Sequence, residues 1–131
     1  MVMLFDRFNL SDDVFETIFA TNQQVIVARA LLQFFKQHEG ELNKTQMSFI
    51  ATQLHEGKLV TRLNIPPYAG KEVRLTYNKR QFYDRILTPF KSMGLVDYDL
   101  YRKVYTLSDK FARDLKSIGL QWMQELKKPP E

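Results

Sequence analysis

The chain has 131 residues, of which 44% are hydrophobic and 26% are charged, with a net charge of +4 and no cysteine. This length suits one domain with a single core, and the composition excludes a largely disordered chain. The lack of cysteine excludes disulfides and thiolate metal sites, and no apolar run approaches the roughly 18 residues of a membrane span. The N-terminus has no signal-peptide pattern, so we expect a single cytoplasmic domain over residues 1–131.

The first forty residues contain two predicted helices. Ser11 is a good N-cap for a short amphipathic helix, and Thr21 caps a second helix that runs to about Gln37. Gly40 ends this second helix. Its apolar residues recur at helical spacing. They are Val25, Ala28, Leu31, Leu32 and Phe35.

A third helix is predicted to begin at Asn43 and to end at Gly57. Gln46 lies three residues after Asn43, which is the spacing of a capping box. The apolar positions that follow share one face of this short helix, which is therefore amphipathic.

The segment 58–76 has two readings. "KLVTRLN" and "KEVRLTY" each alternate apolar with polar or basic residues, and "IPPYAG" between them is rich in turn formers, which favours a β-hairpin or an irregular loop. Alternatively, "LVTRLNIPP" is the end of the first helix of a helix-turn-helix, with Asn64 in the turn. We prefer the hairpin or loop. The Pro66-Pro67 pair breaks whatever precedes it in either reading.

A fourth helix is predicted over residues 78–93. Asn78, with Gln81 three residues later, has the capping-box spacing, and Gly94 ends the helix. Pro89 lies inside it and is expected to kink or loosen the last turn. The apolar stripe consists of Phe82, Ile86, Phe90 and Met93.

The last third of the chain predicts a hairpin followed by a long helix. "LVDY" and "KVYTL" are short strand-like runs separated by "DLYR". Ser108 and Asp109 then begin a helix that ends before Pro129-Pro130. Its apolar residues are Phe111, Leu115, Ile118, Trp122 and Leu126.

Basic residues concentrate in one segment. Residues 58–91 hold eight basic and two acidic residues, a net charge of +6, whereas the other 97 residues sum to −2. Concentrated positive charge is expected of a protein that binds a polyanion, although a solvated basic face has the same composition.

The polar faces of the fourth helix carry side chains that bind base edges and phosphates. Arginine pairs with guanine, and asparagine or glutamine with adenine. Because recognition helices direct their N-terminal residues into the major groove, we interpret this helix as a DNA reader. The candidate residues are Asn78, Lys79, Arg80, Gln81, Tyr83 and Arg85.

Residues 82–115 resemble the second half of winged helix-turn-helix domains. Their sequence is "FYDRILTPFKSMGLVDYDLYRKVYTLSDKFARDL". In that superfamily a recognition helix ends in a Gly-Leu-Val step, a hairpin wing follows, and a Leu-Ser-Asp-Lys start begins the next helix. The resemblance covers about residues 22–126. It implies a mainly α fold with a small antiparallel hairpin, a core over about 22–107, and helical extensions at 1–20 and 108–128.

The resemblance also implies positions for the remaining DNA contacts. Tyr101, Arg102 and Lys103 would form the wing tip, and Lys44 and Thr45 would hold a phosphate. This chain differs from the superfamily pattern in two respects. The wing is short and has two acids, Asp97 and Asp99, that would repel phosphates, and the 58–76 insertion is unusually long. That insertion is interpreted as an added DNA-contacting hairpin or a partner site, with Arg62, Lys71 and Arg74 as its auxiliary contacts.

The last helix indicates a homodimer. Phe111 and Leu115 are expected to pack on the domain's own core, whereas the outer turns would expose apolar surface in a monomer. A symmetric dimer would bury that surface together with part of the first helix. The expected interface residues are Phe15, Phe19, Ile118, Trp122 and Leu126.

We therefore expect a sequence-specific double-stranded DNA-binding protein, a homodimeric transcriptional repressor. Two alternatives remain open: a DNA-binding protein of plasmid or viral replication or partition, and a winged-helix protein-interaction module. No phosphate loop, paired carboxylates beside a histidine, or metal-ligand cluster is present in the sequence, so we expect no enzyme activity, no metal and no cofactor. No residue pattern indicates a small-molecule effector, and none excludes one.

Overall fold

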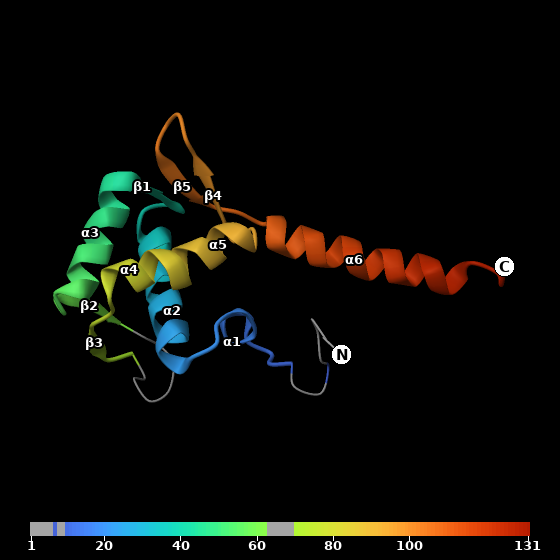
Figure 1. Ribbon diagram of the computed structural model, residues 1–131, viewed down its shortest axis with the longest axis horizontal. Helices are drawn as coiled ribbons and strands as arrows, with labels where there is room; N and C mark the ends of the chain where they lie inside the picture. The colour runs from blue at the N-terminus through green and yellow to red at the C-terminus, as the bar shows by residue number, and fades with distance from the viewer. Residues whose placement is uncertain (1–6, 8–9, 63–69) are drawn as a thin grey trace.

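The computed structural model describes residue 7, residues 10–62 and residues 70–131, and it is an α+β fold with antiparallel sheets (Figure 1). In chain order the elements are α1 (Val14–Ile18), α2 (Asn22–Gln37), β1 (Glu41–Asn43), α3 (Lys44–His55), β2 (Leu59–Arg62), β3 (Glu72–Leu75), α4 (Lys79–Phe82), the π-helical turn η2 (Tyr83–Leu87), α5 (Thr88–Ser92), β4 (Val96–Asp99), β5 (Val104–Leu107) and α6 (Lys110–Lys127).

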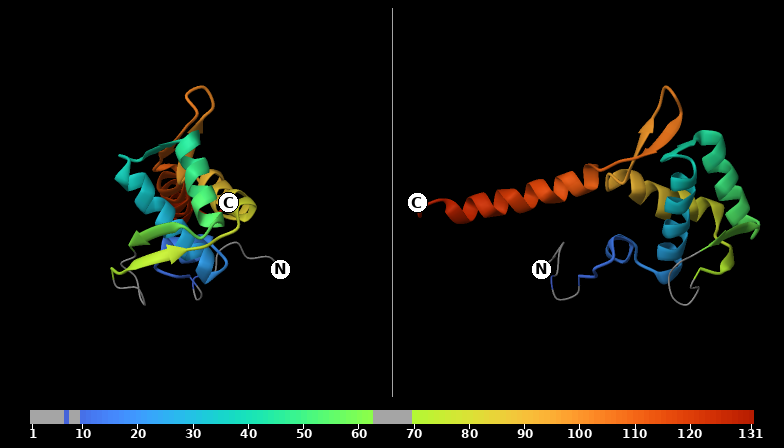
Figure 2. Two further views of the ribbon diagram at one scale, coloured as in Figure 1. Left: turned by 90° about the vertical axis from the view of Figure 1, so that its left-hand side faces the viewer. Right: turned by 180° about the vertical axis from the view of Figure 1, so that it is seen from behind.

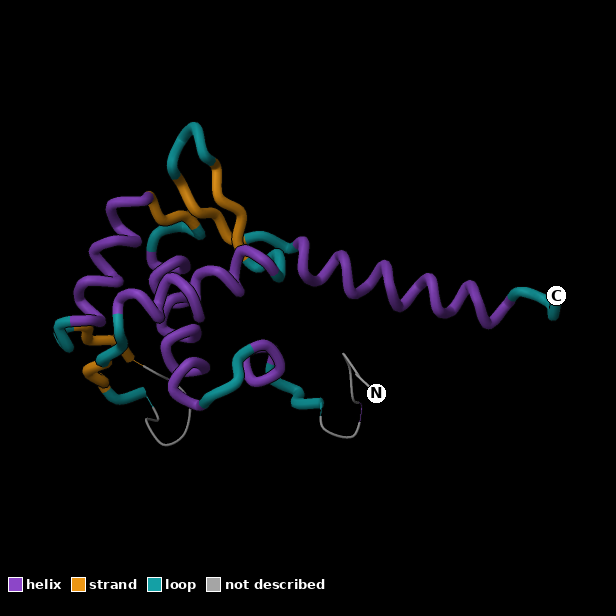
Figure 3. Tube along the Cα trace, in the orientation of Figure 1, coloured by secondary structure: helices purple, strands orange, loops and turns teal. Residues whose placement is uncertain are grey.

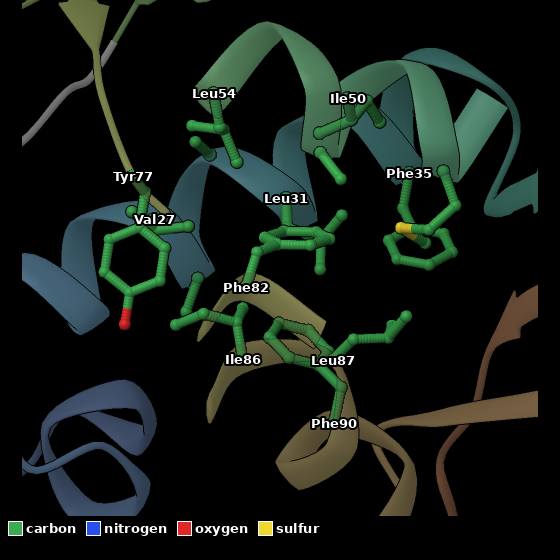
Figure 4. Packing of buried hydrophobic residues seen from close by; sticks show 14 of the residues in the cluster. Val27, Leu31, Phe35, Ile50, Leu54, Tyr77, Phe82, Ile86, Leu87 and Phe90 are labelled. Atoms are coloured by element: carbon green, nitrogen blue, oxygen red, sulfur yellow. The ribbon is translucent and has the colours of Figure 1, made fainter. Parts of the chain in front are cut away.

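The core lies between α2, α3 and the continuous run of helix from α4 to α5 (Figure 4). Phe35, Leu54, Phe82 and Phe90, from these helices, are each at most 1% exposed. Fully burying one such side chain contributes about 1.5–3 kcal/mol. The apolar stripes read from the sequence therefore face one another in this core.

Helix α1 closes one side of this core, which corrects the position expected for its aromatic residues. Phe15 and Phe19 are 6% and 5% exposed. The ring of Phe90 lies 6.2 Å from that of Phe15 and 5.9 Å from that of Phe19. Because α1 folds back onto α5, both side chains are buried within the single chain. They therefore do not form the exposed surface that we expected a dimer to cover.

The predicted N-caps of the two longer N-terminal helices are confirmed. Thr21 and Asn43 each accept a hydrogen bond from the backbone N–H three residues later, and both form complete capping boxes. The N-cap of α1 is Asp13 rather than Ser11. The Ser11 hydroxyl instead accepts the Asp13 N–H at 3.0 Å, and Asp13 is also paired with Arg29 of α2.

The segment 58–76 contains the β-hairpin that we preferred. Strands β2 and β3 pair antiparallel, with Leu59 opposite Leu75 and Arg62 opposite Glu72. The alternative, the end of a helix, is wrong for residues 59–62, because their alternating side chains bury Leu59 and Thr61 on one face. Asn64 and the Pro66-Pro67 pair lie outside the described residues.

A three-stranded sheet in the order β1-β5-β4 forms the second β unit (Figure 3). The predicted hairpin is β4–β5, with Val96 opposite Leu107. Strand β1 was not predicted, and it adds to the edge of β5, with Glu41 opposite Thr106. Gly40, at a φ of 83°, turns the chain from α2 into this strand.

Helix α6 projects from the rest of the molecule (Figures 1 and 2). Its start is held where the Phe111 N–H donates to the Gly94 carbonyl at 3.1 Å. Phe111 is half-buried, but Leu115 is 53% exposed, so the expectation that Leu115 packs on the core is wrong. The helix leaves the core after its first turn, one turn earlier than expected. Among the described residues, no helix is both long and apolar enough to cross a membrane.

Candidate nucleic-acid interface

The run from α4 to α5 presents one buried and one basic face. Phe82, Ile86, Leu87 and Phe90 are buried along one side. The residues on the opposite, exposed side are Arg80, Asp84, Arg85, Thr88 and Lys91. Three basic residues and one acidic residue give this side a net positive charge. The carboxylate of Asp84 lies 3.9 Å from the guanidinium of Arg80, and an exposed pair of this kind offsets the arginine charge only in part.

The middle of this helix is a wide turn rather than a plain kink at Pro89. In η2, the backbone N–H and the hydroxyl of Thr88 both donate to the Tyr83 carbonyl, the hydroxyl at 2.8 Å. Proline has no N–H and its ring crowds the carbonyl four residues earlier, so a five-residue turn before Pro89 relieves the clash. As a consequence, Ile86 and Leu87 are both buried, whereas Met93, predicted in the stripe, is 41% exposed.

Four of the predicted reading residues have structural roles or are partly covered. The Asn78 side chain accepts the Gln81 N–H at 3.0 Å and so caps the helix. Lys79 donates from Nζ to the Thr52 hydroxyl of α3 at 3.1 Å. Gln81 and Tyr83 are half-buried, and the Tyr83 ring packs edge-on against Phe82 at 5.6 Å.

Arg80 and Arg85 are the predicted reading residues that remain exposed. The Arg80 side chain is 92% exposed, and Arg85 is also in the exposed class. Lys91, one turn beyond η2, extends the same basic side and was counted in the basic segment without being assigned to reading. Arginine and lysine bind guanine and phosphate, so this surface suits a nucleic acid.

The β4–β5 hairpin places the predicted wing residues at its tip. Tyr101 is 99% exposed, and Arg102 and Lys103 are exposed beside it. Leu100, which the sequence analysis did not single out, is 75% exposed at the same tip. The chain closes the tip at Lys103, where φ is 54°.

The two wing acids have partners within the chain. The Asp99 carboxylate accepts the backbone N–H groups of Tyr101 and Arg102 at 2.9 and 3.1 Å, which forms the turn. The Asp97 carboxylate accepts a bond from Lys110 Nζ at 2.8 Å. Because both negative charges are engaged, the repulsion of phosphates expected from them is reduced.

The auxiliary residues form two separate groups. Lys44 and Thr45 begin α3, and the Lys44 N–H donates to the Lys103 carbonyl at 3.0 Å, so this helix start adjoins the wing. The exposed Arg62, Lys71 and Arg74 belong to the β2–β3 hairpin or its approach. This hairpin lies at the other end of α3, about 18 Å away at 1.5 Å per residue (Figure 2).

Two further features bear on ligands. A groove of about 380 Å³ between α2 and α3 is lined mainly by apolar side chains, including Phe34, Leu42 and Phe49. Within residues 7, 10–62 and 70–131, no three acidic or histidine side chains are placed to hold a metal ion.

The predicted dimer residues of the last helix are on the surface. Ile118, Trp122 and Leu126 are 65%, 61% and 66% exposed. Helix α6, which carries them, extends away from α4 and α5 (Figure 1).

Comparison with known proteins finds no matching family model, no matching curated protein and no matching solved structure.

Proposed function

We propose that this protein is a winged-helix protein that binds double-stranded DNA. The observation that carries the proposal is the basic side of α4–α5, on which Arg80, Arg85 and Lys91 are each exposed. The hairpin that follows adds Arg102 and Lys103 at a projecting tip, and the start of α3 adds Lys44 beside it. A helix for the major groove and a basic loop for the flanking backbone are the two contacts such a domain needs.

The side chains free to read bases narrow the expected target. With Asn78 used as a cap and Lys79 bound to Thr52, the exposed readers are two arginines. Arginine binds the O6 and N7 atoms of guanine, so the site is expected to contain guanine where α4 enters the groove. Regulation of transcription, as a repressor, is the role we propose for such binding, and plasmid or viral replication or partition is the alternative.

The test compares two double variants of equal charge. Arg80→Ala with Arg85→Ala is expected to weaken binding to a selected duplex by about 1–3 kcal/mol per arginine and to reduce the salt slope of log K by about 2. The control, Lys36→Ala with Lys116→Ala, removes two exposed charges from α2 and α6. Fluorescence anisotropy at two salt concentrations, on duplexes recovered from a random pool, measures both quantities.

Three outcomes are informative. Loss confined to the Arg80/Arg85 variant supports reading by α4–α5. Equal loss in both double variants would contradict it, because binding would then follow net charge alone. No binding at low salt would contradict DNA binding altogether.

A protein-interaction module is the second candidate, and one observation favours it. The groove between α2 and α3 is apolar, and Phe49 at its edge is 63% exposed. An apolar groove with an exposed aromatic residue suits a peptide or helix of another protein. If DNA binding fails the test above, Phe49→Ala in a partner-binding assay becomes the deciding variant.

A further inference from the structure

Helix α6 carries an apolar stripe with the spacing of a two-helix seam. Phe111, Leu115, Ile118 and Trp122 follow one another at intervals of four, three and four residues. This alternation keeps the four side chains on one line along a helix and is the pattern of coiled-coil contacts. The stripe is narrow, and the opposite side of the helix mixes charged residues such as Arg113 and Lys127 with the exposed Leu120.

The stripe is uncovered in the single chain. Leu115, Ile118 and Trp122 are 53%, 65% and 61% exposed, and the helix extends away from the other described elements (Figure 2). A soluble monomer seldom leaves a row of large apolar residues in water. From Ala112 onward every residue of α6 is exposed, so the stripe is open to a partner that runs alongside the helix.

We propose that the partner is a second copy of this chain, whose α6 packs antiparallel against the first. In this arrangement Leu115 of one copy faces Ile118 of the other, and Phe111 faces Trp122. Both pairs occur twice by symmetry, which gives four apolar layers. The inference is independent of DNA binding, because no residue of the basic side of α4–α5 takes part.

The charges beside the stripe favour the antiparallel direction. A parallel pair would place Glu125, which continues the seam three residues after Trp122, against Glu125 of the second copy. The antiparallel register instead places Glu125 opposite Ser108 of the second copy, which keeps the two carboxylates apart. Like charges directly opposite one another in a seam disfavour the orientation that brings them together.

The other flank of the stripe also fits an antiparallel pair. Ala112 and Gly119 occupy it, and the register that joins Leu115 to Ile118 brings Ala112 of one copy to Gly119 of the other. Apart from its chain neighbours and the backbone of its own helix, a Cβ atom added at Gly119 would meet no atom of the described residues within 4 Å, so the space there is open to a neighbour. Small residues on one flank allow two helices to approach closely.

The size of the contact predicts its strength. The 18 residues of α6 are about 27 Å long, and four layers amount to two heptads. So short a seam is marginal alone, and we expect a dimer that dissociates in the micromolar range.

The first experiment measures mass against concentration by sedimentation equilibrium of the full chain. The wild-type chain is expected to reach twice its 15.5 kDa mass as concentration rises. Ile118→Asp places a charge in the seam and is expected to weaken association more than about tenfold. The matched control is Leu120→Asp, because Leu120 is 51% exposed on the opposite side of the same helix. A monomer at all concentrations, or equal loss in both variants, would overturn the proposal.

The second experiment measures direction. The chain has no cysteine, so Lys127→Cys gives one spin label per copy, on a side away from the stripe. In the antiparallel dimer the two labelled positions are about 30 Å apart along the helix axis, at 1.5 Å per residue. In a parallel dimer this axial separation is zero, and the labels are separated only across the pair, by about 8–10 Å between helix axes plus the reach of two outward-pointing side chains. A short distance between the labels would overturn the antiparallel arrangement even if the dimer forms.

Discussion

Gly94 joins α5 to the β4–β5 hairpin through a backbone conformation that favours glycine. Its φ is 79°, and a Cβ atom there would lie 3.1 Å from the Phe111 backbone nitrogen and 3.2 Å from Lys110 Cβ. The same residue accepts the Phe111 N–H that holds the start of α6. A single residue therefore positions both the wing and the last helix.

Gly94→Ala is expected to lower the free energy of unfolding by about 2–3 kcal/mol, because it combines backbone strain with a steric clash. The control is Gly40→Ala. Gly40 also has a positive φ, of 83°, but its added Cβ would meet nothing closer than 4.0 Å. This variant should lose only the strain, about 1–2 kcal/mol. Urea denaturation measures both, and equal losses would show that the close approach to Phe111 has no cost.

At the scale of the secondary-structure element, the first residues of α4 hold the helix in place and are not free side chains. Asn78 was predicted to enter the major groove, yet its side chain accepts the Gln81 N–H. The next residue, Lys79, donates its backbone N–H to His55 Nδ1 at 3.2 Å and its ammonium to Thr52. The first residues of α4 therefore hold the helix against α3, and Arg80 is the first residue of α4 left exposed for the base contacts that we propose.

Asn78→Ala should lower the free energy of unfolding by about 1 kcal/mol, because it removes an N-cap. Asn78→Ser keeps a capping oxygen and should remain close to wild type in both thermal stability and DNA affinity. If Asn78→Ser lost DNA affinity while its stability was unchanged, the asparagine amide would be a base contact after all.

Elements with local signals at both ends could be predicted from the sequence. Helices α2 and α3 have a capping residue at the start, a glycine beyond the end and an apolar stripe between them, and each was placed within a residue or two. The β2–β3 hairpin followed from alternation on either side of a run of turn formers. In each case the information lies within a few residues of the element.

Other elements depend on contacts that are distant in the sequence. Strand β1 has three residues, too few for a pattern, and exists because β5 offers an edge. The turn η2 results from a balance between Pro89 and the packing of Ile86 and Leu87. In the candidate site, the residue types pointed to Asn78 and Lys79, but their partners on other turns and helices decide whether they are free.

At the scale of the whole molecule, the free energy of unfolding is expected to depend on pH in the alkaline range through Tyr105 of strand β5. Burial, followed by the negative charges of Tyr98 and Tyr83 when ionised, raises the pKa of Tyr105 above its ordinary 10.0. The folded chain thus keeps a proton that the unfolded chain releases above about pH 10. The contribution of this proton to the free energy of unfolding is complete below about pH 10 and is lost as pH rises through the pKa of Tyr105 in the folded chain.

The free energy of unfolding is therefore expected to fall more steeply with pH above about pH 10 in the wild type than in Tyr105→Phe. Phenylalanine keeps the ring that stacks on Tyr98 at 4.4 Å but does not titrate. Urea denaturation at several pH values around 10 measures the difference. Parallel curves for the two proteins would contradict the assignment of this proton to Tyr105.

The pairing of β1 with β5 also governs when the domain can fold. Glu41 lies opposite Thr106, so a strand from the first third of the chain is completed by one near its end. Closing so long a loop costs entropy before the pairing compensates for it, which slows folding relative to a bundle of local helix contacts. During synthesis, the strand after α2 has no edge to join until β5 has been made. The native sheet is therefore expected to form late, after α2 to α5 have been synthesised.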